Sequence, residues 1–204
     1  MPKFKNALRL RISGICGFLA PVFAFALIFS AIASYSQFSW VDNALSDLGV
    51  VAGVTAVLFN SGLLIGGALC FIFATGLSVF LKERTVGRIG AFVLVLTSLA
   101  LFAIGVFPEN VRPAHYFVSV MFFVLLPISM LIIAGTFWLT RQVRMAVFTL
   151  LVAVAAAAPW VLYFSIHYVS GVAVPEAVSA FAGSVWAVAM SGKMLRQASH
   201  SKIP

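Results

Sequence analysis

The side chains that could do chemistry lie in short polar segments between long apolar runs. They are Asp42, Ser46 and Asp47 in segment 37–52, Glu109 and Arg112 in segment 108–113, His115 just after it, and His167 just before segment 169–174. Carboxylates, imidazoles and hydroxyls serve as acids, bases, nucleophiles and metal ligands. A guanidinium offers a planar fork of donors to phosphate oxygens. These residue types therefore support acid–base catalysis, metal binding or anion recognition.

Four of these residues are candidates for catalysis: Ser46, Asp47, Glu109 and His115. We expect Asp47, Glu109 and His115 to converge, because each stands at the end of a predicted helix. Those ends have similar depth, and packed helices lie ~8–10 Å apart. The alternative is that the three residues share one face of the membrane without meeting.

Four further residues are candidates for ligand binding: Asp42, Asn60, Arg112 and His167. Arg112 either pairs with a nearby acid or binds a phosphate group. Asn60 lies inside a predicted helix, where a polar side chain is either functional or a contact between helices. Glu176 follows Pro175, and we interpret it as a favourable charge in the first turn of the last helix, with membership of the site as the alternative.

No spacing in the sequence identifies a metal centre or a hydrolase. Neither HxxxH nor HExxH occurs, so no two histidines are predicted on one helical face. The G-x-S-x-G pattern of a nucleophilic serine is missing too. Metal and cofactor stay unassigned from the sequence.

The elements that must position these residues are membrane helices. The 204 residues are 63% hydrophobic and 9% charged, whereas a soluble domain carries roughly 25% charged residues. Six apolar runs are long enough to span a bilayer, which takes about 20 residues. They lie at about 12–36, 53–81, 89–107, 114–140, 145–168 and 175–192. We predict an all-α, six-transmembrane-helix bundle that forms one domain over 1–204 in the cell membrane.

The basic residues predict the orientation of this bundle. Twelve of the thirteen fall in four clusters at the N-terminus, around 82–88, at 141–144 and at 193–202, and only Arg112 lies outside them. Positive charge beside membrane spans stays in the cytoplasm, so both termini are predicted to be cytoplasmic. The net charge of +8 then reflects topology and contact with lipid headgroups, and it does not indicate nucleic acid. The acids and histidines listed above fall on the extracytoplasmic face.

The segment between the first two spans is predicted to form a short interfacial helix. Val41, Leu45 and Leu48 recur with helical spacing and form one apolar stripe, and Gly49 is suited to end the helix. We expect residues 40–48 to lie along the membrane surface with this stripe inward. The alternative is a solvated connector.

A combination of motifs resembles one known family. The motifs are S-D-L-G at 46–49, N-x-G-x-x-x-G-G at 60–67 and F-P-E at 107–109, with His115 following. Together they are similar to the multi-pass membrane proteins of archaea and bacteria catalogued as domain of unknown function 998. The resemblance covers roughly 10–190 and implies six spans. It carries Ser46, Asp47, Asn60, Gly62, Gly66, Pro108, Glu109 and His115 over as motif positions.

The sequence therefore favours an integral membrane protein with a polar extracytoplasmic site that binds or processes a lipid headgroup. Its expected partners are membrane lipids. The alternative is a structural subunit of a membrane complex, in which Gly62 and Gly66 form a face for another helix or another copy. The sequence does not decide whether the protein is an enzyme.

Overall fold

A computed structural model shows six long helices and one short 3-10 helix. It describes residues 2–200, with side chains from residue 5, so Lys202 of the last basic cluster lies outside the described residues. The elements are α1 (Pro2–Ala33), η1 (Leu45–Val50), α2 (Val54–Phe80), α3 (Thr85–Val106), α4 (Ala114–Leu139), α5 (Val143–Ile166) and α6 (Ala173–His200). All six long helices are apolar and long enough to cross a membrane. The predicted all-α, six-span fold is confirmed.

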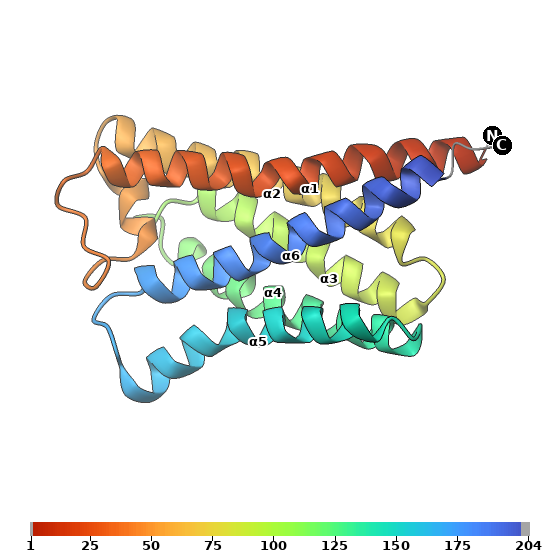
Figure 1. The fold of residues 1–204 in the computed structure, drawn as a ribbon. Coiled ribbons are helices and arrows are strands. Elements are labelled where there is room, and N and C mark those ends of the chain that lie inside the picture. The colour runs from red at the N-terminus through yellow and green to blue at the C-terminus, as the bar shows by residue number, and fades with distance from the viewer. Residues whose placement is uncertain (1, 201–204) are drawn as a thin grey trace.

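The six helices form a closed ring. Each packs against the next helix along the chain, and α6 returns to pack against α1, while contacts across the ring are few. Figure 1 shows α6 crossing obliquely: it meets α1 near the two termini and lies away from it at the opposite end. A ring of six helices encloses a central space, which side chains must fill.

Glycines set the close approaches within the ring. At the end near the termini, Gly14 and Gly17 let α1 lie directly against Leu195 and Ser191 of α6. Gly62 and Gly66 of α2 face α1. The small-residue face predicted to receive another helix is therefore occupied within the chain. Each glycine removes the side chain that would hold the two helices apart.

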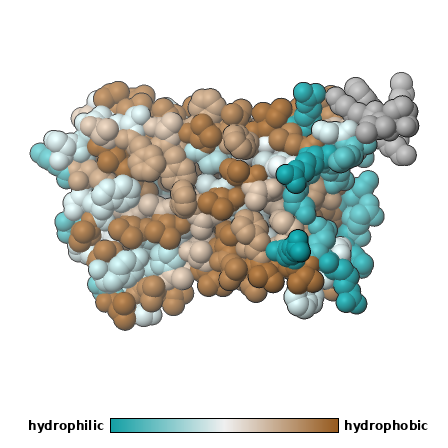
Figure 2. Space-filling model, in the orientation of Figure 1, coloured by the Kyte–Doolittle hydropathy of each residue, from teal (hydrophilic) through white to brown (hydrophobic). Residues whose placement is uncertain are grey.

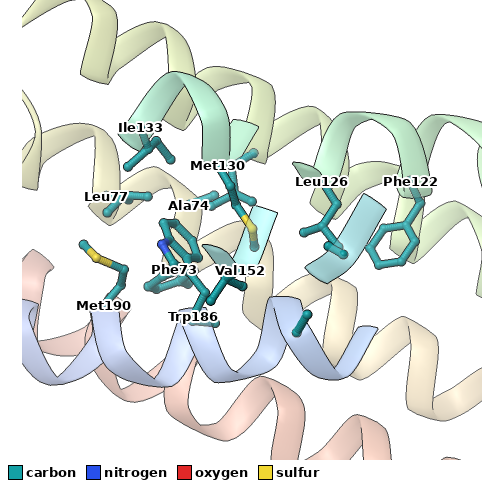
Figure 3. Close-up of a cluster of buried hydrophobic side chains, with 14 of the residues drawn as sticks. Phe73, Ala74, Leu77, Phe122, Leu126, Met130, Ile133, Val152, Trp186 and Met190 are labelled. Carbon is teal, nitrogen blue, oxygen red and sulfur yellow. The ribbon is translucent and has the colours of Figure 1, made fainter. Parts of the chain in front are cut away.

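The half of the ring nearer the two termini has a densely packed core. Trp186, Phe73 and Met130 meet at its centre, with the Trp186 and Phe73 rings edge to face at 6.1 Å between centroids (Figure 3). The Trp186 indole N–H donates to the Thr149 hydroxyl on α5 at 3.1 Å. A buried indole N–H needs such a partner, and the bond ties α6 to α5.

The two ends of the bundle differ in charge. We call the end that carries the α2–α3 and α4–α5 connections and both termini the basic end. The opposite end holds Asp42, Asp47, Glu109 and Glu176, and we call it the acidic end. Figure 2 shows the most hydrophilic residues gathered toward the basic end, further hydrophilic residues at the acidic end, and mainly hydrophobic residues between them. Such a surface suits the hydrocarbon of a bilayer.

Several predicted boundaries and the interfacial helix need correction. The first helix begins at Pro2 instead of residue 12, and the last runs to His200 instead of residue 192, because both continue beyond their apolar stretch. The interfacial element is a 3-10 helix that begins only at Leu45. Leu45 and Leu48 are 7% and 0% exposed as predicted, but Val41 is 52% exposed.

Gly49 also departs from its predicted place. It lies inside η1, so it does not end the helix. A Cβ there would lie 2.8 Å from the Asn60 side-chain oxygen, and the glycine lets η1 sit against α2.

Candidate functional site

The loop that leads into η1 is shaped by Asp47. Its carboxylate accepts hydrogen bonds from the backbone N–H of Ala44 at 2.9 Å and from the side chain of Asn43 at 2.8 Å. The Asn43 side-chain oxygen in turn accepts from the Ser39 N–H at 2.8 Å. Asp47 thus satisfies free donors at the start of a helix, as acidic residues commonly do. Its observed contacts are structural ones within segment 39–47.

Asp42 joins this loop to the α5–α6 connection. Its carboxylate accepts from the hydroxyls of Ser39 at 2.6 Å and Ser170 at 2.7 Å. These two hydrogen bonds stabilise the charged form and hold the pKa of Asp42 below its ordinary value. The backbone N–H of Gly171 donates to the Val41 carbonyl at 2.6 Å, which extends the same contact. Asp42 therefore fastens two surface connections together.

Ser46, Glu109 and Arg112 form one polar chain at the acidic end. The Ser46 hydroxyl donates to one oxygen of Glu109 at 3.1 Å, and the Arg112 guanidinium binds the other oxygen at 3.0 Å. Ser46 is buried, whereas the Arg112 side chain is 75% exposed. Of the alternatives open for Arg112, the structure thus shows the ion pair with Glu109. The chain runs from solvent to the interior of the bundle.

Glu176 is a buried carboxyl group at the inner end of this region. It is 9% exposed, and its Oε2 accepts the backbone N–H of Leu45 at 2.6 Å. The carboxylates of Glu109 and Asp47 lie close enough to interact with it electrostatically. The interpretation of Glu176 as only a favourable first-turn charge missed this contact between α6 and η1. A buried carboxyl group needs strong partners, because its desolvation is costly.

His115 is buried at the start of α4 with both ring nitrogens engaged. Nδ1 lies 2.8 Å from the Phe107 carbonyl, and Nε2 lies 3.3 Å from the Ser119 hydroxyl. Because a carbonyl can only accept, Nδ1 carries a proton, and in the neutral form of the ring Nε2 accepts from the Ser119 hydroxyl. Asp47, Glu109 and His115 thus lie at one end of the bundle, and each makes its hydrogen bonds with a different partner.

Asn60 and His167 take no part in the polar chain of Ser46, Glu109 and Arg112. The Asn60 amide donates to the Gly49 carbonyl at 3.0 Å, while its oxygen is buried without a hydrogen-bond partner among the described residues. His167 ends α5 in a left-handed conformation and is exposed, with its ring 5.8 Å from that of Tyr163. Asn60 therefore anchors η1 to α2, and His167 lies outside the polar chain.

An apolar cavity of about 130 Å³ extends inward from Ser46 and Glu176. Its walls come from η1, α1, α2, α3, α4 and α6, and its floor is formed by Phe73, Met130 and Trp186. Ten residues of α6 separate Glu176 from Trp186, a distance of ~15 Å at 1.5 Å per residue. The cavity thus reaches about half the ~30 Å thickness of a bilayer core.

Comparison of the sequence with known protein families agrees with the six-span architecture. A family described as "Protein of unknown function (DUF998)" matches residues 18–193, most of the described helices. The chain belongs to the DUF998 family. No curated protein and no solved structure matches it. The DUF998 match thus confirms the resemblance inferred from the motifs at 46–49, 60–67 and 107–109, and it brings no activity with it.

The candidate site includes residues that the sequence did not identify. Within residues 2–200, no group of three or more histidines, cysteines or acids is arranged to hold a metal ion. Glu176 and Ser119 were missed as site residues, although both line the cavity. For Ser119 the available signal was its position four residues after His115, which places both side chains on one face of α4.

Proposed function

We propose that this protein binds a single-chain amphiphile of the membrane, with the polar head at the acidic end and the apolar tail in the cavity. The observation that carries this proposal is the junction of a buried carboxyl group, Glu176, with an apolar cavity of about 130 Å³. Binding sites commonly combine apolar walls with a few polar groups that fix orientation. Here the carboxyl group lies at one end of the cavity, and the hydroxyls of Thr97, Ser98 and Ser184 are bonded to carbonyls of their own helices.

The head that suits this site donates hydrogen bonds. The polar groups at this end of the cavity are mostly acceptors: the buried carboxyl group of Glu176, and the Glu109 carboxylate that accepts the Ser46 hydroxyl. Arg112 is already paired with Glu109, so a phosphate has no free cation to meet among these residues. A negatively charged head would be repelled by the acids. Neutral hydroxyl groups can share the carboxylate oxygens, so we favour a hydroxylated head such as glycerol.

The tail that suits the cavity is a single slender chain. A dry cavity of about 150 Å³ accepts a molecule the size of benzene, whereas pockets for drug-sized ligands measure roughly 300–1,000 Å³. The observed volume is at the lower end of this scale. It has room for part of one hydrocarbon chain and excludes two chains side by side. Diacyl lipids are therefore disfavoured as occupants.

The seam between α1 and α6 supports entry from the membrane. Most wall residues on α2, α3 and α4 are buried. On α1 and α6, six of the eleven wall residues are partly exposed: Pro21, Ala24, Phe25, Ala180, Gly183 and Ser184. Phe25 and Phe181 meet across this seam with ring centroids 6.2 Å apart. The two helices diverge toward the acidic end (Figure 1). A ligand already in the bilayer can reach the cavity by displacing these rings.

The test is binding of a 1-O-alkylglycerol to the purified protein, followed by native mass spectrometry. This probe has a glycerol head, one chain and no ester. We expect saturable binding of one molecule, and much weaker binding of a fatty acid with the same chain or of the dialkyl analogue. Ala180→Phe should fill the cavity and reduce affinity at least tenfold. Val178→Phe adds the same ring to an exposed position on α6 and is the matched control.

Two results would overturn the proposal. One is equal binding of the fatty acid and the alkylglycerol, because acidic groups around a true headgroup site disfavour a carboxylate. The other is equal affinity in the Ala180→Phe and Val178→Phe proteins, because the tail would then lie outside the cavity. Glu176→Leu should also weaken alkylglycerol binding without changing the number of molecules bound.

A further inference from the structure

Ser119 differs from the other cavity-wall hydroxyls that lie on the six long helices. In membrane helices, Ser and Thr normally donate to a backbone carbonyl three or four residues earlier. Thr97, Ser98 and Ser184 do so, with distances of 2.9, 2.7 and 2.8 Å. The recorded hydrogen bond of Ser119 instead joins its hydroxyl to the His115 side chain. A serine bonded to an imidazole nitrogen is the arrangement that activates a hydroxyl nucleophile.

The orientation of His115 fits the role of a general base. The Phe107 carbonyl, 2.8 Å from Nδ1, fixes the proton on that nitrogen and turns the free lone pair of Nε2 toward Ser119. His115 is 8% exposed, so water competes little for this lone pair. In catalytic triads a carboxylate holds the base in this way. Here a backbone carbonyl at the end of α3 holds the ring.

Ser119 also stands where the head and tail of the proposed ligand would join. It lines the apolar cavity together with Glu176 and Ser46. Glu176 lies in the first turn of α6, whereas Ser119 lies more than one turn into α4. The hydroxyl is thus below the polar head and above the apolar floor. In an acylglycerol, the ester bond occupies that position.

We propose that Ser119 and His115 form a catalytic dyad that cleaves the carboxylic ester of a single-chain acylglycerol. This inference rests on the binding function proposed above. The Ser119 oxygen attacks the ester carbonyl carbon while His115 Nε2 takes the hydroxyl proton. The carbon–oxygen bond to glycerol then breaks, and His115 protonates the departing alkoxide. Water then attacks the acyl-serine carbonyl while His115 takes a proton from it. The bond from the acyl carbon to the Ser119 oxygen breaks, and His115 returns the proton to that oxygen, which releases the fatty acid and restores the Ser119 hydroxyl.

The carbonyl oxygen needs a hydrogen-bond donor during this reaction, because negative charge develops on it. Ser46 is the second wall hydroxyl whose recorded hydrogen bond goes to a side chain. Its proton points to Glu109, and a rotation of the side chain frees it for a ligand. Removing one such donor typically slows a reaction by about 10²–10³-fold. Ser119 and His115 thus carry out nucleophilic attack and proton transfer, whereas Ser46 stabilises the carbonyl oxygen.

The experiment uses a long-chain fluorophosphonate, a reagent that reacts covalently with activated serines, on the full-length protein in detergent. Peptide mass spectrometry then locates the adduct. We expect labelling of Ser119, its loss in Ser119→Ala, and a decrease of about 10²–10⁴-fold in rate in His115→Gln, the range of general-base contributions. Release of fatty acid from monoacylglycerol should decrease in parallel. Ser129→Ala removes another hydroxyl of α4, which donates to the Leu126 carbonyl at 2.7 Å and has no histidine partner, and should leave labelling unchanged.

The outcomes separate this inference from the binding function. If wild-type protein binds the 1-O-alkylglycerol but is not labelled and releases no fatty acid, the dyad is wrong and binding stands. Labelling that is unaffected by His115→Gln would also overturn the dyad. If alkylglycerol binding fails, the binding function is wrong whatever the label shows. A folded Ser119→Ala protein that still binds the alkylglycerol shows that loss of labelling is not loss of structure.

Discussion

Replacing Glu176 tests the contact that joins α6 to η1. The buried carboxyl oxygen accepts the Leu45 N–H at 2.6 Å. Glu176→Leu keeps a side chain of similar size but leaves that N–H without a partner. An unsatisfied buried donor costs about 1–3 kcal/mol. Glu176→Gln keeps a carbonyl oxygen as acceptor for the Leu45 N–H. We therefore expect the free energy of unfolding to fall by about 1–3 kcal/mol for Leu and by under ~1 kcal/mol for Gln.

Hydrogen exchange at the Leu45 amide is the most direct measurement of this effect. Local opening governs the exchange of a protected amide. Each 1.4 kcal/mol is tenfold, so Glu176→Leu should speed exchange at Leu45 by roughly 5–150-fold. The Val111 amide, bonded to the Pro108 carbonyl at 2.8 Å in another connection of the acidic end, is the control and should not change. Equal acceleration in the Leu and Gln proteins would refute the reasoning, because only Leu lacks the acceptor.

Three other predictions test packing, the η1 surface and topology. Gly67→Ala should lower the free energy of unfolding by about 1–3 kcal/mol in a detergent denaturation assay, because its Cβ would lie 2.6 Å from a backbone nitrogen of α3. Gly135→Ala meets nothing within 4 Å and should be neutral or stabilising, so equal losses would contradict the packing. Leu45→Asp should reduce folded yield more than Ala44→Asp, because Leu45 is buried beside Glu176; equal yields would mean that η1 is solvated. A reporter at Asn110 should report the extracytoplasmic side and one in the α4–α5 connection the cytoplasm, and the reverse would overturn the predicted orientation.

Local sequence determined the helices and the separation of charge between their ends. A run of about 20 apolar residues must form a helix in a bilayer, because each backbone polar group needs a partner within the segment. The ion pair between Glu109 and Arg112 was also one of the predicted alternatives, because the two residues are only three positions apart. Such features depend on neighbours in the chain and can be predicted from composition, spacing and charge.

Segment 40–48 shows where local pattern stops being sufficient. The spacing of Val41, Leu45 and Leu48 fits an α-helix, yet only the last two are buried. The backbone at Val41 instead bonds to Gly171 and the hydroxyl of Ser170, and the loop takes its path from that distant connection. Helical periodicity carries no information about a partner 130 residues away.

The tertiary structure alone decided which residues form the site. The hydrogen bond from Leu45 to Glu176 spans 131 positions, and the cavity exists only because α6 closes the ring against α1. That closure depends on long-range packing at Gly14 and Gly17, and a sequence does not state which surfaces meet. Glu176 looks like an ordinary first-turn acid and Ser119 like any helix serine until the ring encloses them. Their chemistry comes from desolvation and shared surroundings, which are properties of the folded bundle.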